Sequence, residues 1–150
     1  MSKTIQIKYM SQDSVRLGNV DKAKSEWIDL YTESPIEIKA FKAGMVDLGV
    51  AMKLPDGYEA IVAARSSLFN KHHVMLTNGI GIIDNAYSGD TDFWKANLLA
   101  LEDTFIPAGT RIVQFKIVPT MAEAGDVIEF EEVQHLSSES RGGFGSTGDR

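Results

Sequence analysis

The chain has 150 residues, no cysteine and a formal net charge of −6, with 43% hydrophobic and 24% charged residues. These values are typical of one globular domain, and they exclude disulfides and thiolate metal sites. The negative charge argues against general affinity for nucleic acid or anionic membranes. The sequence has neither a run of about 18 apolar residues, which a transmembrane helix needs, nor the apolar core of a signal peptide. We therefore expect a cytoplasmic protein.

From the N-terminus onward, the hydrophobic pattern is mostly that of short β-strands. Thr4 to Tyr9 alternates between apolar and polar positions, and residues 12–24 predict a polar loop. Further strands are predicted at residues 26–31, 36–39, 45–54, 58–64, 93–101, 111–118 and 127–133. Ser66 to Lys71 predicts one short helical turn, and Asp56-Gly57 is a strong turn signal. Many short strands joined by such turns favour an all-β sandwich or barrel.

A glycine-rich stretch from Asn78 to Asp90 interrupts this pattern with three glycines, and it contains Asp84 and Tyr87. We expect a β-hairpin here, because glycine within a strand pattern marks a bulge or a close approach of backbone to a ligand. The backbone groups at its open end would form a fixed pattern of donors and acceptors that can read a nucleobase edge. Taken alone, the stretch also fits a simple turn with a hydrogen-bonded aspartate and a core tyrosine.

The tail from Ser137 to Arg150 is rich in glycine and serine, so its composition predicts a flexible arm. It nevertheless carries Phe144, and an aromatic ring in a polar tail often orders onto a ligand or partner. Backbone N–H groups at residues 143–147 could form an anion nest, with Arg141 adding a charge-assisted hydrogen bond. We predict a domain of residues 1–136 followed by an arm of residues 137–150. The alternative is a disordered C-terminus.

Five motifs, in this order and spacing, resemble those of the trimeric dUTP pyrophosphatases (dUTPases). They are Trp27-Ile28-Asp29-Leu30; Arg65-Ser66-Ser67; Asn78 with Ile83-Asp84 and Tyr87-Ser88-Gly89; Gly109-Thr110-Arg111-Ile112-Val113-Gln114; and Arg141-Gly142-Gly143-Phe144-Gly145-Ser146-Thr147-Gly148. The run from Asp90 to Trp94 is similar to the branch found in Gram-positive bacteria and their phages. The resemblance implies a dUTPase-like jelly-roll (β-clip) fold and a homotrimer. It also implies active sites shared between subunits, with the C-terminal arm closing over a neighbouring site.

The resemblance further implies hydrolysis of dUTP to dUMP and pyrophosphate by attack of water on the α-phosphorus. This reaction keeps uracil out of DNA and supplies dUMP for thymidylate synthesis. Asp84 matches the aspartate that orients and deprotonates the water, and Gln114 matches the glutamine that helps to hold it. Without the other motifs, Gln114 would pass for an ordinary residue on a strand surface.

Substrate binding is implied for three groups of residues. Asn78, Gly81 and Ile82 would read uracil through their backbone, where each unpaired buried group costs a wrong base about 1–3 kcal/mol. Tyr87 would pack under the deoxyribose and exclude a 2′-hydroxyl, although a core aromatic fits the position too. The phosphates and the base would be covered by Arg65, Ser66, Ser67, Arg141, Phe144, Gly145, Ser146 and Thr147.

Supporting roles are expected for Asp29 and for Mg²⁺. Asp29 resembles the aspartate of the first motif, which supports the site from nearby. Mg²⁺ retains much of its hydration shell, so we expect phosphate oxygens and water to bind it, without a direct protein ligand. His72 and His73 are interpreted as surface or interface residues rather than metal ligands.

Three alternatives stay open at this point. A dCTP deaminase-like enzyme has the same fold, but it uses a glutamate in the strand after the hairpin, and residues 93–101 contain none. A phage dUTPase could also bind a host protein in a regulatory role. A structural jelly-roll protein would not explain the Arg141–Gly145 motif. Phe93 and Trp94 could line the uracil pocket or pack at a trimer interface.

Overall fold

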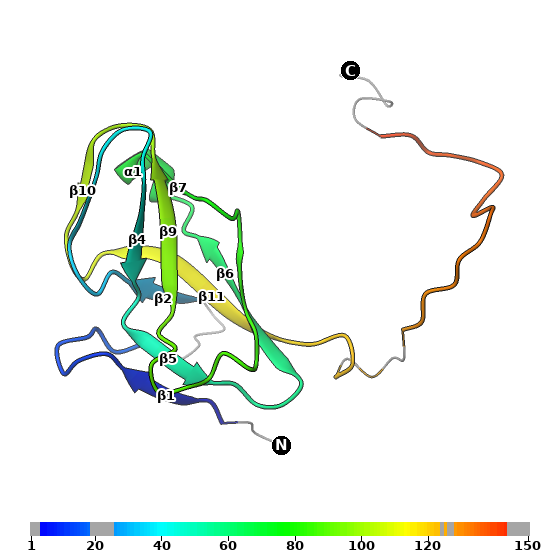
Figure 1. The fold of residues 1–150 in the computed structure, drawn as a ribbon, viewed down its shortest axis with the longest axis horizontal. Coiled ribbons are helices and arrows are strands. Elements are labelled where there is room, and N and C mark those ends of the chain that lie inside the picture. Colours follow the sequence, from blue (N-terminus) through cyan, green and yellow to red (C-terminus); the bar gives the residue numbers. More distant parts are fainter. Residues whose placement is uncertain (1–3, 19–25, 124, 126–127, 144–150) are drawn as a thin grey trace.

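The computed structural model describes residues 4–18, 26–123, 125 and 128–143 (Figure 1). Within these residues the chain forms short strands and one short helix, which confirms the predicted all-β class. The elements are β1 (Gln6–Tyr9), β2 (Ile28–Tyr31), β3 (Ile36–Ile38), β4 (Ala43–Asp47), β5 (Val50–Lys53), β6 (Tyr58–Ala64), α1 (Leu68–His72), β7 (Val74–Leu76), β8 (Gly81–Ile83), β9 (Lys95–Ala100), β10 (Thr104–Ile106) and β11 (Arg111–Pro119).

All strand pairs are antiparallel, and they form four small sheets. The largest has the order β2–β11–β6–β8, and a second has the order β4–β9–β7. Two-stranded sheets, β1–β5 and β10–β3, complete the body. The long strand β11 joins β2 to β6, and it thereby aligns residues that are far apart in the sequence.

The core lies between these sheets, and it shows where the side chains of Phe93 and Trp94 lie. Trp94 has 0% exposure, and its ring meets that of Phe115 edge to face, with 5.3 Å between the ring centroids. Trp94 is therefore a core residue, neither in a uracil pocket nor at an interface. Phe93 is partly buried, and the Lys8 ammonium lies 5.8 Å from its ring centroid.

Two strand predictions were wrong in detail. The single strand expected at residues 45–54 is two strands, because the chain turns at Gly49, whose φ of 76° suits glycine and whose missing side chain makes room for Glu33. Residues 104–106 form the unexpected strand β10, which pairs with β3 and places Thr104 opposite Ile38. Such a short segment is recognised as a β-strand only from its pairing with a neighbouring strand.

The strand predicted at residues 127–133 is also wrong for the part that the structure describes. Residues 128–143 extend away from the body without regular secondary structure, and every one of them is exposed (Figure 1). The alternating pattern is present in Ile128 and Phe130, and the Phe130 side chain is 93% exposed. A strand needs a neighbour, and the described chain offers none to this segment.

Candidate active site

A carboxylate on β2 joins two arginines at one end of the large sheet. Arg65 Nε donates to Asp29 Oδ1 at 3.1 Å, and Arg111 Nη1 lies 3.5 Å from Asp29 Oδ2. Asp29 and Arg65 are both partly buried. The backbone also fixes this corner, since Arg65 N donates to Ile112 O at 3.1 Å. Asp29 therefore orients both guanidinium groups.

Gln114 belongs to the same corner because of strand register. It stands directly opposite Asp29 on β2 and Ala63 on β6. Directly opposed residues project from the same face of an antiparallel sheet, so the Gln114 side chain lies on the Asp29 side. Gln114 Nε2 donates to Ala64 O at 3.3 Å, which leaves its amide oxygen free to accept. The structure thus brings together Asp29, Arg65 and Gln114 within one chain.

A polar cavity of about 320 Å³ opens beside this corner. Its lining residues are Arg65, Lys71, His72, Gly109, Thr110 and Arg111. On one side stands α1, which is anchored by the buried Leu68 and preceded by Ser67. On the other side, Thr32 holds the turn before β11, because its hydroxyl donates to Pro107 O at 2.7 Å and accepts from Thr110 N at 3.0 Å. Positive side chains lining a cavity in an acidic protein form a suitable anion site.

The imidazole of His72 differs from its neighbours in this cavity. Burial, together with the positive charges of Lys71 and His73, lowers the pKa of His72 below its ordinary value of 6.5. His72 is therefore neutral at pH 7, so the positive charge of the cavity comes from its lysine and arginines.

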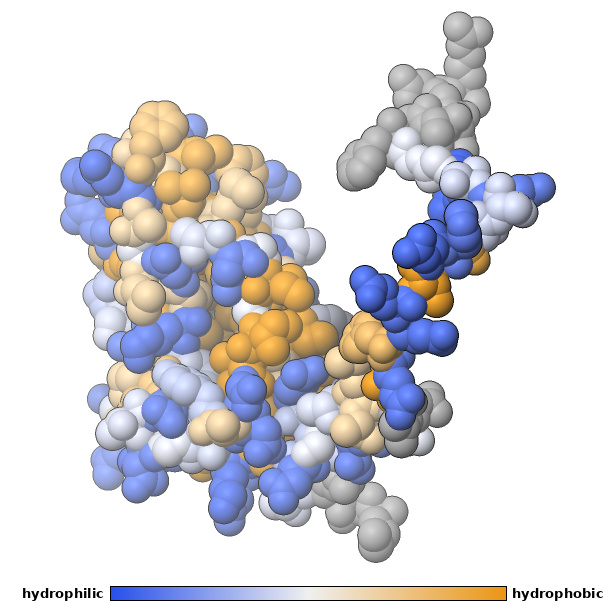
Figure 2. All heavy atoms as spheres, turned by 45° about the vertical axis from the view of Figure 1, so that its right-hand side comes forward, coloured by the Kyte–Doolittle hydropathy of each residue, from blue (hydrophilic) through white to orange (hydrophobic). Residues whose placement is uncertain are grey.

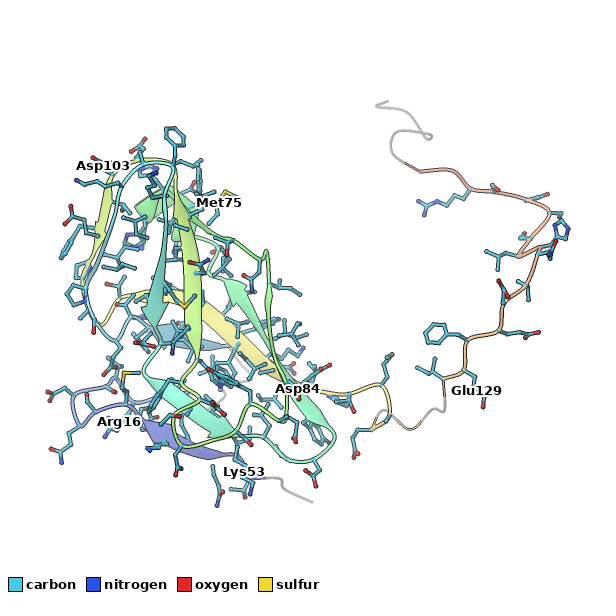
Figure 3. All side chains as sticks on the ribbon, in the orientation of Figure 1. Arg16, Lys53, Met75, Asp84, Asp103 and Glu129 are labelled. Carbon is cyan, nitrogen blue, oxygen red and sulfur yellow. The ribbon has the colours of Figure 1, made fainter. Side chains whose placement is uncertain are left out.

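Asp84 lies far from this corner in the same chain. It directly follows β8, whose Ile83 pairs with Ala60 near the start of β6, whereas Arg65 follows the end of β6. Six residues of extended strand span roughly 20 Å. Figure 3 shows Asp84 at the end of the body where β6 begins, away from α1. One chain alone does not bring Asp84 and Arg65 together.

The local turn presents Asp84 to solvent. Its Oδ1 accepts from Ala86 N at 2.7 Å, a short-range bond that fixes the carboxylate, and its carbonyl accepts from Tyr87 N at 3.0 Å. The next residue anchors the turn, because Asn85 Nδ2 donates to Leu54 O at 3.1 Å and to Pro55 O at 2.7 Å. The result is an exposed, oriented carboxylate with one oxygen available.

Tyr87 is held at the surface rather than in the core. It is 39% exposed, and its hydroxyl donates to Phe93 O at 3.0 Å. The loop between the two residues is closed by a second bond, from Gly89 N to Asp92 Oδ2 at 2.8 Å. The tyrosine ring therefore has a fixed position beside the Asp84 turn.

The hairpin expected at the glycine-rich stretch differs from the structure. β7 and β8 flank the turn, but β7 pairs with β9 and β8 pairs with β6. The turn therefore connects two sheets, and β7 and β8 do not pair with each other. Asn78 and Ile82 are exposed, and Gly81 stands opposite Val62 on β6. The exposed apolar side chains here and nearby include Met75, Ile80 and Ile82. Figure 2 shows a hydrophobic area on this side of the body.

The described arm residues lie apart from the corner at Asp29 and from the turn at Asp84. Arg141 is exposed on the extended segment, with no hydrogen bond or ion pair to the rest of the described chain. Phe144, Gly145, Ser146 and Thr147 lie outside the described residues.

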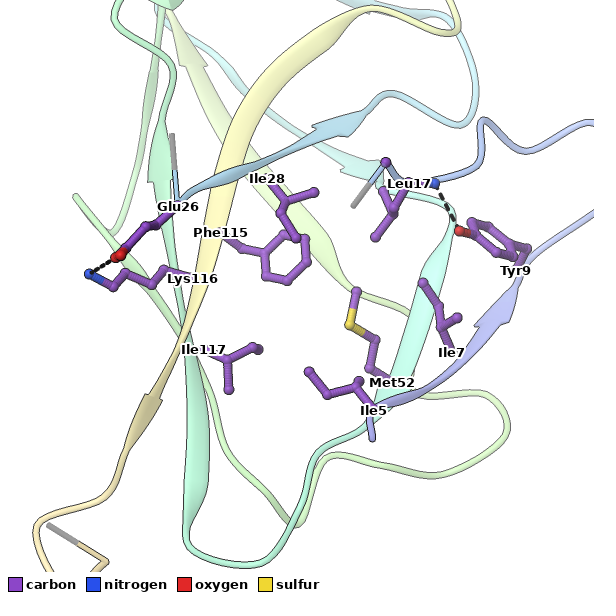
Figure 4. A pocket seen from close by; sticks show the side chains of 11 residues that line it. Ile5, Ile7, Tyr9, Leu17, Glu26, Ile28, Met52, Phe115, Lys116 and Ile117 are labelled. Atoms are coloured by element: carbon purple, nitrogen blue, oxygen red, sulfur yellow. Dashed lines mark hydrogen bonds and ion pairs between the residues drawn. The ribbon is translucent and has the colours of Figure 1, made fainter. Parts of the chain in front are cut away.

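A second, apolar cavity of about 520 Å³ lies beside β1, β2, β5 and β11 (Figure 4). It is lined mainly by Ile5, Ile7, Tyr9, Leu17, Ile28, Met52, Phe115 and Ile117. At its rim, Lys116 Nζ lies 3.5 Å from Glu26 Oε2, and the Tyr9 hydroxyl accepts from Leu17 N at 2.8 Å. Among the described residues, β1 pairs only with β5, so its outer edge is free.

The sequence model of the dUTPase family matches residues 16–148. The chain belongs to the dUTPase family. It is 42% identical over 144 residues to the SPbeta prophage-derived deoxyuridine 5'-triphosphate nucleotidohydrolase YosS of Bacillus subtilis strain 168, covering 96% of this chain and 97% of that protein. The dUTPase of Staphylococcus bacteriophage 80alpha, solved as a point mutant with dUpNHpp, has the same fold. Its TM-score is 0.74 at 22% identity, covering 98% of this chain and 99% of that one.

A second phage structure bears on metal binding. A dUTPase mutant from phage phi11 of S. aureus, described as coordinating a structural Mg(II) ion, matches with a TM-score of 0.71 at 17% identity, over 89% of this chain and 99% of that one. In the described part of the present chain, no group of three or more His, Asp or Glu side chains is arranged to hold a metal. Nor does any described helix have the length and hydrophobicity to cross a membrane.

Three residues of this corner were not placed in the site from sequence, and His72 was expected only at a surface or interface. Arg111 lies inside the fourth motif, but only the fold shows that it shares Asp29 with Arg65. Lys71 and His72 line the same cavity from α1. The spacing of Ser67 and Lys71, four positions apart, was the available signal, because such residues share one helix face.

Proposed function

We propose that the chain hydrolyses dUTP to dUMP and pyrophosphate. The observation that carries this proposal is that a chain of the dUTPase family has both a cationic cavity at Arg65 and an exposed, oriented carboxylate at Asp84. Curated relatives of the chain are named deoxyuridine 5'-triphosphate nucleotidohydrolases. A phosphate-binding corner and an acceptor for a water proton are the two parts that this reaction needs.

In the proposed reaction, Asp84 accepts a proton from a water molecule, and Gln114 helps to hold that water. The water oxygen bonds to the α-phosphorus, the bond from that phosphorus to the bridging oxygen breaks, and pyrophosphate leaves. Arg65, Ser66 and Ser67 hold the phosphates, while Asp29 keeps Arg65 oriented. Arginine suits this role, because its planar guanidinium binds phosphate oxygens in pairs.

Nucleotide selection is assigned to the glycine-rich turn and to the arm. The backbone of Asn78, Gly81 and Ile82 reads uracil, and the Tyr87 ring packs under the deoxyribose. Support comes from the unpaired edges of the turn and from the fixed, half-exposed ring. From the arm, Arg141, Ser146 and Thr147 add phosphate contacts. Phe144 stacks over the base, with Gly145 beside it, and excludes water.

The chain acts as a homotrimer with shared sites. Asp84 and Arg65 lie at opposite ends of β6, so a complete site needs Asp84 from one chain and Arg65 from another. Exposed Met75, Ile80 and Ile82 provide apolar surface for such an interface. The exposed segment with Ile128 and Phe130, and the apolar cavity beside the free edge of β1, suggest that the arm of one subunit docks on the next.

Mg²⁺ would serve as the counter-ion of the triphosphate. Phosphate oxygens and water are its natural ligands, and Mg²⁺ usually keeps several waters when bound to nucleotides. The direct protein contribution is then limited to orienting the phosphates.

Membership of the dUTPase family favours this activity over dCTP deamination, and it leaves room for a host-protein partner of a phage-encoded enzyme. The test is pyrophosphate release with dUTP, UTP, dTTP and dCTP. We expect turnover of dUTP far above that of the other three. Release of ammonia from dCTP would instead support a deaminase, and a lack of turnover with all four would contradict the proposal.

A further inference from the structure

The cavity beside Asp29 has more positive side chains than the carboxylate of Asp29 can neutralise. Arg65 and Arg111 both contact the single carboxylate of Asp29, while Lys71 lines the same cavity without any carboxylate within ion-pair distance among the described residues. His72 is neutral at pH 7. The cavity thus has an excess of two positive charges, although the whole chain has a net charge of −6. An uncompensated charge of this kind suits a polyanionic ligand.

Helix geometry directs Lys71 toward the phosphate motif. Lys71 N donates to Ser67 O at 3.0 Å, so the two residues lie one turn apart on one face of α1. Long side chains on a helix lean back toward its N-terminus and cover the preceding turn. Lys71 is exposed, and it lines the same cavity as Arg65.

We propose that Lys71 is a specificity residue that binds the β- or γ-phosphate of the nucleotide and favours the triphosphate over the monophosphate. This inference rests on the proposed function, since it concerns the phosphate end of the same site. Lysine acts here as a mobile point charge, whereas Arg65 is fixed by Asp29.

The test compares Lys71→Met with the wild-type chain in two assays. Methionine keeps an unbranched apolar stem and removes the charge. Calorimetric titration with Mg²⁺ and inorganic tripolyphosphate should show affinity reduced about tenfold, the loss of one charge-assisted hydrogen bond. The KM for dUTP should rise by a similar factor of about ten, with kcat changed by less than about threefold. Inhibition by dUMP, which lacks the two outer phosphates, should be unchanged.

The controls separate charge from structure. Lys42→Met removes an exposed lysine outside the cavity and should behave like wild type, and Lys71→Arg should retain most tripolyphosphate affinity. Equal tripolyphosphate affinity in Lys71→Met and wild type would overturn the inference, as would an equal loss of dUMP binding. Because the titration involves no turnover, a wild-type chain that binds tripolyphosphate through Lys71 but leaves dUTP intact would refute the proposed function alone.

Discussion

Asp84 and Arg65 lie at opposite ends of β6. Asp84 directly follows β8, which ends opposite Ala60 near the start of β6, and Arg65 directly follows the last residue of β6. Both residues belong to motifs of one family, yet a single chain keeps them roughly 20 Å apart. The extended strand β6 separates the two positions, so they do not meet within one chain. Under the proposed function, the two motifs of one chain therefore contribute to different sites of an assembly.

Asp84→Asn should lower kcat by a factor of about 10² to 10⁴, because asparagine keeps the shape of the side chain but cannot accept the water proton. Binding of dUpNHpp should remain within a few-fold of wild type. Pyrophosphate release and calorimetry measure these two effects. Asp56→Asn, in an exposed turn, is the matched control and should leave kcat unchanged. Full activity of Asp84→Asn would remove this residue from the mechanism.

Removal of residues 140–150 should leave a folded trimer with kcat/KM for dUTP about 100-fold lower, since groups that position the phosphates and cover the base are lost. Size-exclusion chromatography with light scattering checks the assembly, and pyrophosphate release checks the activity. Unchanged turnover by the truncated chain would show that the arm has no part in catalysis.

Tyr87→Phe should show how much the hydroxyl of Tyr87 contributes to positioning its ring. The substitution removes the hydroxyl that donates to Phe93 O, a bond with a net stabilisation of about 1 kcal/mol. A loosened ring should lower the preference for dUTP over UTP about fivefold, as measured by the ratio of the two kcat/KM values. Tyr87→Ala should lower it further. An identical ratio in Tyr87→Phe and wild type would mean that the bond to Phe93 does not position the ring.

His72 should make stability depend on pH. Its pKa is lowered in the folded chain by burial and by the charges of Lys71 and His73, so the unfolded chain binds a proton at a higher pH than the folded chain does. The free energy of unfolding should therefore decrease as the pH falls from 6.5 toward the folded pKa. Urea denaturation at fixed protein concentration, at about pH 5 and pH 7.5, should show a smaller decrease for His72→Gln than for wild type. An equal decrease in both would exclude His72 as the source, and His135→Gln in the exposed arm is the control.

The strand pattern could be predicted from sequence wherever alternation and turn residues agree, as at Tyr58–Ala64 and Arg111–Pro119. Prediction failed where the presence of a neighbouring strand decides whether a segment forms a strand. Thr104–Ile106 is a strand because β3 lies beside it, and residues 128–133 are not, because the described chain offers them no neighbour. The motifs identified Asp29, Arg65 and Gln114, but their alignment depends on the register of β11 with β2 and β6. No local pattern encodes that register.

The most direct test of the shared site is a mixture of two inactive chains. Asp84→Asn and Arg65→Met each damage every site of a pure trimer. In randomly mixed trimers, about one site in four combines an intact Asp84 from one chain with an intact Arg65 from another. We predict that chains co-expressed in equal amounts regain about a quarter of wild-type dUTP hydrolysis. Activity no higher than that of the separate variants, in trimers shown by mass spectrometry to be mixed, would contradict a site built from two subunits.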